Sequence, residues 1–199
     1  MLISGALRWL GPLRCSPVIA LVGAALLVSG CGPSADFVTK KDSATQALQA
    51  LRSSAPAGYR SGPIEGGTWP NEGRGPNVWM SMKRHGGVID AAAECQRVRQ
   101  WAKDSGATKF QDGNDGSNPV SPIAGNEELA QAICVKWWKP ALTSQVEVGS
   151  PILIFYGTYA QDGRVLAPFT IQANAGVDAP ATEGALTPWV NIFVVTEFQ

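Results

Sequence analysis

The single histidine of the chain, His85, limits the catalytic chemistry that the sequence supports. A serine or cysteine nucleophile usually takes a histidine as its general base, so a triad in this chain would have to use His85. This residue follows Lys83 and Arg84 and precedes two glycines, a pattern that predicts an exposed position at a strand end. The sequence has no Gly-x-Ser-x-Gly elbow, no Walker loop and no dinucleotide fingerprint. We therefore predict no catalytic residue and no cofactor.

Paired carboxylates are the other route to hydrolysis, because a glycosidase needs two of them in one cleft. Glu127 and Glu128 are adjacent on a predicted helix, so their side chains diverge by about 100°. They are better explained as first-turn residues that interact favourably with the helix dipole. Asp90 and Glu94 lie four apart on another predicted helix, where they also suit its N-terminal half. A hydrolase that uses acidic residues therefore remains an alternative without an identified pair.

The segment from Asp112 to Asn118 has the composition of a calcium loop, Asp-Gly-Asn-Asp-Gly-Ser-Asn. An EF-hand places oxygen ligands at positions one, three and five and a glycine at position six. Here Gly116 occupies position five and Ser117 position six, so the segment is not an EF-hand. A polar turn is the default interpretation, and a looser calcium site is the alternative. We predict no metal ligand in the chain.

The N-terminus has the organisation of an export signal. Residues 1–14 carry Arg8 and Arg14 and no acidic residue, and an apolar stretch from Val18 to Val28 follows. This is a basic n-region followed by an h-region of signal-peptide length. Eleven helical residues rise only about 16 Å, roughly half the hydrocarbon core of a bilayer, which argues against a membrane-spanning helix.

The apolar stretch ends in Leu-Val-Ser-Gly followed by Cys31, and this run resembles the lipobox of bacterial lipoprotein precursors. The resemblance implies that residues 1–30 are a signal peptide and that Cys31 carries a thioether-linked diacylglycerol. It implies a lipid-anchored protein on the extracytoplasmic side of a cell membrane. The alternatives are an uncleaved signal anchor and an ordinary secretory signal cut near Gly30. We expect a lipidated tether at residues 31–41 and a single domain at 42–199.

Two cysteines, Cys95 and Cys134, remain after Cys15 leaves with the signal and Cys31 takes the lipid. Because disulfides persist outside the cytoplasm, we predict that these two form a bridge. Each lies on the apolar stripe of a predicted helix, so the bridge would place the two helices side by side. A redox-active or metal-binding pair is the alternative, but the spacing matches no CxxC unit.

The charge balance gives no support to a nucleic-acid partner. The chain has 16 basic and 16 acidic residues, and the signal removes two arginines, which leaves 14 basic residues and a net charge of −2. A near-neutral chain of this kind has no electrostatic reason to bind nucleic acid.

The tryptophans are better candidates for a binding surface. Trp137 and Trp138 are helical neighbours that cannot face the same way, and we expect Trp138 to be partly exposed. An exposed aromatic would suit a protein or glycan partner.

Hydrophobic periodicity predicts the remaining elements. Helices are expected at residues 43–53 and 88–104 and after Asn126, up to Pro140. Strands are expected at 78–83, 107–111, 152–160, 165–172 and 189–198, and the glycine- and proline-rich residues 56–77 are expected to be an irregular loop. Asp162-Gly163 predicts a hairpin turn.

This order of elements predicts an α+β two-layer sandwich of about three helices on a mainly antiparallel sheet. The sequence favours a non-enzymatic binding or scaffolding role in the cell envelope, with an envelope protein or glycan as partner. A cell-wall-directed hydrolase is the rival. A carrier with a lipid cavity would need a larger sheet than the sequence indicates.

Overall fold

The computed structural model describes residues 34–68, 76–115, 119–143, 152–178 and 185–198. The signal peptide and the lipid site Cys31 lie outside these residues, so both stay predictions. The helices and strands run in the order α1 (Ala35–Ser53), β1 (Arg60–Thr68), β2 (Pro76–His85), α2 (Ala91–Asp104), β3 (Ala107–Asp112), β4 (Ser121–Pro122), α3 (Glu127–Ala141), β5 (Ile152–Gln161), β6 (Arg164–Asp178) and β7 (Thr187–Glu197).

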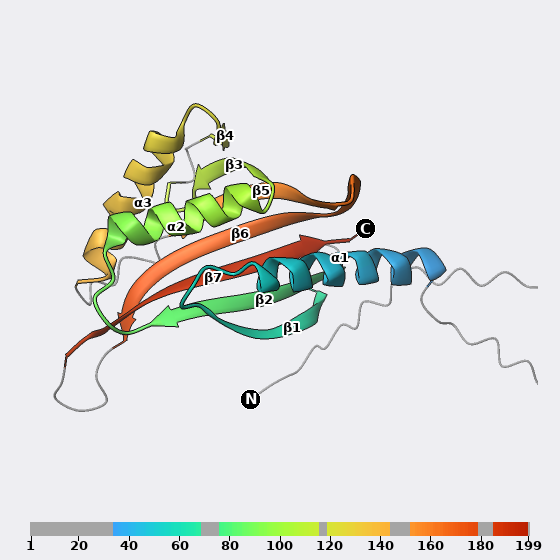
Figure 1. The fold of residues 1–199 in the computed structure, drawn as a ribbon, viewed down its shortest axis with the longest axis horizontal. Helices are drawn as coiled ribbons and strands as arrows, with labels where there is room; N and C mark the ends of the chain where they lie inside the picture. Colours follow the sequence, from blue (N-terminus) through green and yellow to red (C-terminus); the bar gives the residue numbers. More distant parts are fainter. Residues whose placement is uncertain (1–33, 69–75, 116–118, 144–151, 179–184, 199) are drawn as a thin grey trace, which may run out of the picture.

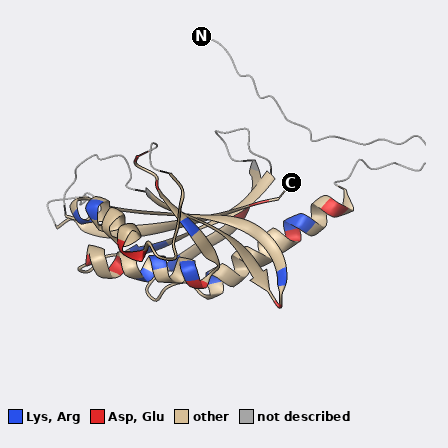
Figure 2. Cartoon of the chain, turned by 90° about the horizontal axis from the view of Figure 1, so that it is seen from above, with Lys and Arg blue, Asp and Glu red and all other residues tan. Residues whose placement is uncertain are grey.

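All of these strands join one sheet in the order β1-β2-β7-β6-β5-β3-β4. Every adjacent pair is antiparallel. The three helices cover one face of the sheet, as Figures 1 and 2 show. The predicted α+β two-layer sandwich is therefore confirmed, with a seven-stranded sheet that is larger than the sequence indicated.

The core lies between the helices and the inward side chains of the central strands. Met80, Ile171 and Ile192 are fully buried on β2, β6 and β7. Along each of these strands, such buried residues alternate with residues that face away from the helices, as expected for a sheet covered on one face. From α1, Leu48 and Leu51 reach the same core.

The hairpin between β5 and β6 has the turn that the sequence predicted. Asp162 and Gly163 have φ values of 51° and 75°, the left-handed backbone of a type I′ turn. Pro168 pairs with Thr158 of β5, but the pairing of β6 with β7 begins only at Phe169. The missing N–H of the proline therefore costs no hydrogen bond to β7.

Helix α1 begins earlier than predicted and includes residues assigned to the tether. The hydroxyl of Ser34 accepts a hydrogen bond from the backbone N–H of Phe37 at 3.2 Å, which caps the helix. Asp36 in the first turn favours the same start because its charge opposes the helix dipole. Residues 35–41 are thus helical, and the predicted start at Ser43 is wrong. The glycine- and proline-poor sequence after Ser34 lets the helix extend in this direction.

Residues 60–68 form strand β1, where the sequence predicted an irregular loop. The strand pairs only with β2, so it lies at an edge of the sheet, where proline is tolerated. A register shift between Ser61 and Ile64 accommodates Pro63. The ring of Trp79 then lies against Gly67, where an added Cβ would be 3.3 Å from the ring. Residues 76–77 of that predicted loop begin strand β2, and residues 69–75 lie outside the described part of the chain.

The buried face of α3 is rotated relative to the prediction. Its buried residues are Ala130, Cys134, Trp138 and Ala141. Trp138 is only 1% exposed, whereas Leu129 of the same helix is 48% exposed. The expectation that Trp138 is the exposed aromatic is therefore wrong. The error arose because both faces of this helix carry apolar residues, so periodicity alone does not identify the inner one.

The disulfide between Cys95 and Cys134 is confirmed. It joins α2 to α3 across a Cα–Cα distance of 6.1 Å and a sequence separation of 39 residues. Both cysteines are 1% exposed. The bridge fixes these two helices side by side. Helix α1 lies on the same face of the sheet, against β2, β7 and β6 (Figure 1).

Candidate functional site

The candidate site is a groove of about 540 Å³ on the helical side of the molecule. Its walls come from the end of α1 and the second half of α2, and β5 contributes Tyr159. The lining residues are Ala50, Ser54, Pro56, Arg97, Gln100, Trp101, Asp104, Ser105 and Tyr159. Its volume is in the range of small-ligand sites in proteins.

The groove combines aromatic and polar groups at fixed positions. The indole N–H of Trp101 donates to the hydroxyl of Ser54 at 3.2 Å, which links α2 to the end of α1. The amide of Gln100 donates to the carboxylate of Asp104 at 2.8 Å. Asp104 is the one carboxylate among the lining residues, and Arg97 is the one cation. The lining therefore offers two rings, several hydrogen-bonding groups and no net charge.

The guanidinium of Arg97 binds a buried carboxylate. Glu94 is 2% exposed and accepts a hydrogen bond from the guanidinium of Arg97 at 3.2 Å. It also accepts from the guanidinium of Arg84 on β2 and, at 2.7 Å, from the hydroxyl of Tyr59. A buried carboxylate needs such partners to offset its lost hydration. We call Tyr59, Arg84, Glu94 and Arg97 the Glu94 cluster; it joins α2, β2 and the segment before β1.

The Glu94 cluster affects the pKa of the Tyr59 hydroxyl. Burial raises the pKa of the Tyr59 hydroxyl well above its ordinary value of 10.0, and the neighbouring Glu94 carboxylate raises it further. The folded protein therefore retains this proton at pH values where the unfolded chain releases it. A proton held only by the folded state makes stability fall as pH rises above 10.

We expect Tyr59→Phe to remove part of this alkaline destabilisation. Between pH 10 and 11, the free energy of unfolding of the wild-type chain should fall by about 1 kcal/mol more than that of Tyr59→Phe, since the unfolded tyrosine is half ionised at pH 10 and almost fully ionised at pH 11. Urea unfolding at a series of pH values measures both slopes, and every other titrating group is shared by the two chains. A constant difference between the chains from pH 8 to pH 11 would contradict the prediction.

The other sequence-predicted candidates lie away from the groove. His85 ends β2 and is half exposed, and its Nδ1 lies 3.5 Å from a carboxylate oxygen of Asp178. The predicted exposed position at a strand end is confirmed. Glu127 lies in the first turn of α3, 3.1 Å from the ammonium of Lys103. Its backbone N–H and then Lys103 lower the pKa of this carboxyl.

Asp112, the first residue of the considered calcium loop, already has protein partners. One carboxylate oxygen accepts from the backbone N–H of Asn114 at 3.0 Å, which forms a polar turn. The other accepts from the indole N–H of Trp137 at 3.0 Å and so ties β3 to α3. Residues 116–118 of this segment lie outside the residues that the structure describes. In the described ranges, no three His, Cys, Asp or Glu residues gather closely enough to hold a metal ion.

A second aromatic region lies on the sheet face opposite the helices. The ring of Trp189 on β7 packs against Gly176 of β6, where an added Cβ would be 2.6 Å from the ring. The ammonium of Lys83 lies 4.4 Å from the centroid of the same ring, in cation–π contact. Only glycine at position 176 leaves room for this arrangement.

Sequence reasoning missed both Glu94 as the centre of a buried cluster and the groove itself. Glu94 was considered only as a partner of Asp90, but Asp90 caps α2 by accepting from the backbone N–H of Ala93 at 2.7 Å. The usable signal was position: Glu94 precedes Cys95 on the predicted inner stripe of α2, so its side chain lies at the edge of the core.

No helix in the described ranges is both long and apolar enough to cross a bilayer. No protein-family model matches this sequence, and comparisons with curated proteins and with solved structures also give no match.

Proposed function

We propose that this chain is a lipid-anchored cell-envelope protein whose domain binds an envelope partner without catalysing a reaction. The lipobox-like run ending at Cys31 supports the anchor, and the disulfide agrees with an oxidising compartment. The groove between α1 and α2 carries the binding role. Its lining combines Trp101 and Tyr159 with several polar side chains, as is typical of a ligand site.

The chemistry of the groove favours a glycan as its ligand. Sugar hydroxyls pair with planar polar groups such as those of Arg97, Gln100 and Asp104, and the apolar face of a sugar ring packs on an aromatic ring. Opposite charges on Arg97 and Asp104 suit a neutral ligand better than a strongly charged one. A hydrolase would need a second carboxylate beside Asp104, whereas a lipid carrier would need an enclosed apolar cavity rather than an open groove lined partly by polar side chains.

We expect the purified protein to sediment with isolated cell-wall sacculi that protease and detergent have freed of bound protein. Gln100→Ala should weaken this binding about two- to tenfold, the effect of one lost hydrogen bond. Gln96→Ala is the matched control, because Gln96 is exposed on the same helix and does not line the groove. Free N-acetylglucosamine oligomers should compete with the sacculi.

Failure of the wild-type protein to sediment would exclude cell-wall glycan as the ligand. Equal weakening by both substitutions would show that binding does not use the groove.

A further inference from the structure

We infer that the N-terminal end of α1 lies in the head-group layer of the membrane and that the lipid anchor therefore fixes which end of the domain faces it. This inference rests on the proposed lipidation of Cys31. Three peptide units separate Cys31 from Ser34, the N-cap of α1. Even a fully extended chain of this length spans only about 11 Å between Cα atoms. The helix thus starts almost directly at the anchor.

Helix α1 transmits this constraint to the domain because it has no flexible joint. It runs without interruption from Ala35 to Ser53, and its second half is buried in the core through Ala44, Leu48 and Leu51. Its first half is also held, since the ring of Phe37 packs edge-to-face on Phe198 with centroids 5.3 Å apart. Phe198 is itself 6% exposed. The helix therefore cannot swing away from the sheet without breaking an aromatic contact.

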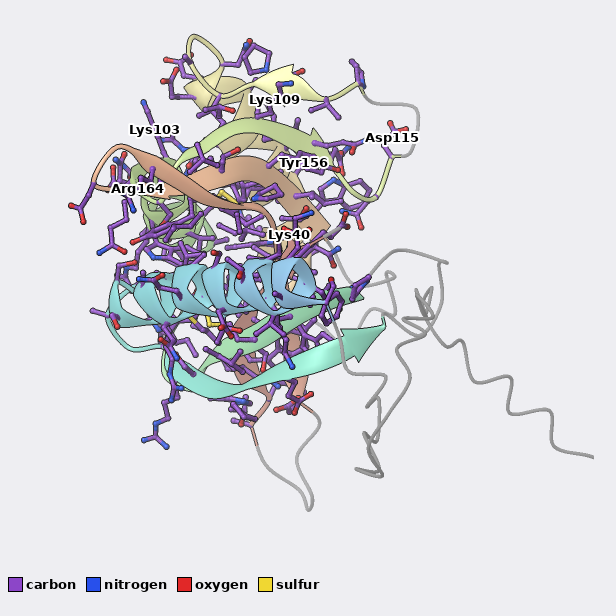
Figure 3. The ribbon with its side chains drawn as sticks, turned by 90° about the vertical axis from the view of Figure 1, so that its right-hand side faces the viewer. Lys40, Lys103, Lys109, Asp115, Tyr156 and Arg164 are labelled. Carbon is purple, nitrogen blue, oxygen red and sulfur yellow. A yellow bond between two sulfur atoms is a disulfide. The ribbon has the colours of Figure 1, made fainter. Side chains whose placement is uncertain are left out.

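The end of the molecule toward which the start of α1 points also contains the β5–β6 hairpin, as Figure 1 shows. Figure 3 views this end directly, with Lys40 of α1 and Arg164 of the hairpin labelled. The loop between β2 and α2, which contains Val88, lies at the opposite end. The anchor should hold the end with the start of α1 and the β5–β6 hairpin against the membrane. The end with the β2–α2 loop should then face away from the membrane.

The surface of this end suits a lipid head-group layer of either charge type. Val38 in the first turns of α1 is 42% exposed, so an apolar side chain is available to the interface. Lys40 pairs with Asp36 at 3.1 Å, and Lys41 is followed by Asp42. The formal charges of these four residues cancel. The contact should therefore not depend on anionic lipid, unlike that of a polybasic segment.

Two valines at opposite ends of the domain provide a matched test. Val38→Cys and Val88→Cys would each be made in the full chain, which is then processed in a bacterial host, purified and labelled with an environment-sensitive fluorophore. Val88 is 95% exposed, so its label reports an exposed site at the far end. Reconstituted into phosphatidylcholine vesicles that carry a head-group nitroxide, the label at Val38 should be strongly quenched and that at Val88 unaffected.

The same quenching is expected in vesicles with 30% phosphatidylglycerol, a composition chosen to be about one-third anionic. A ten-residue Gly/Ser insertion between Pro33 and Ser34 should relieve the quenching at Val38, since it adds roughly 17 Å of mean reach. Intact mass separates the two ways of failing. A mass without diacylglycerol would overturn the proposed anchor, whereas a lipidated protein with equal quenching at both labels would overturn the orientation inferred here.

Discussion

Replacing Cys95 and Cys134 together by alanine is expected to lower the free energy of unfolding by about 4 kcal/mol. The disulfide closes a loop of 39 residues, and in the chain-entropy model it stabilises the fold by restricting the unfolded chain. It is a direct covalent cross-link between α2 and α3. For a domain of this size, the loss corresponds to a fall in melting temperature of roughly 8–16 °C.

Thermal unfolding measured with and without a reductant tests this prediction. The reductant should lower the melting temperature of the wild-type protein most of the way to that of the double variant. The melting temperature of the double variant should not change. Membrane attachment should be the same in both, because the proposed lipid is carried by Cys31 and not by either of these cysteines. Labelling of both thiols in the purified, unreduced protein would contradict the bridge itself.

Glu94→Ala is expected to lower the free energy of unfolding by a similar amount, about 3–5 kcal/mol. The substitution removes the buried carboxylate and leaves Arg84, Arg97 and the hydroxyl of Tyr59 without their shared partner. Breaking a buried ion cluster in this way is costly, since the remaining charges stay partly desolvated. Its loss should also release Arg97 from its position at the wall of the groove.

Urea unfolding of Glu94→Ala beside two controls measures this effect. Glu94→Gln keeps the shape and two hydrogen-bonding atoms, so it should lose less stability than Glu94→Ala. Glu128→Ala removes an exposed carboxylate from α3 and should change stability by less than about 0.5 kcal/mol. A Glu94→Ala protein within 1 kcal/mol of the wild type would show that the Glu94 cluster is not a principal support of the fold.

The residues that define the groove could not have been identified as a group from the sequence. Ser54, Trp101 and Tyr159 are separated by about 50 residues at each step, and only the packing of α1 and α2 on the sheet brings them together. The Glu94 cluster has the same origin, because Tyr59 and Arg84 lie on segments that meet α2 only in the folded chain. Periodicity describes one element at a time and has no information on such contacts.

Local patterns did determine much of the fold. The stripe that contains Cys95 identified the inner face of α2, the Asp162-Gly163 pair identified the hairpin, and alternation identified the core strands. These features depend on backbone preferences and on burial of one face, which neighbouring residues specify together. The strand at 60–68 could not be recognised this way, because an edge strand rich in glycine and proline becomes a strand only through its pairing with β2.

Helix α3 shows the same division within a single element. Its sequence determined that residues 127–141 form a helix, with Glu127 and Glu128 in the first turn. Which of Trp137 and Trp138 is buried was decided by tertiary structure, since the apolar residues surround the helix too evenly for the pattern to choose. The disulfide from Cys134 and the hydrogen bond from Trp137 to Asp112 set the rotation of the helix, and that rotation places Trp138 in the core.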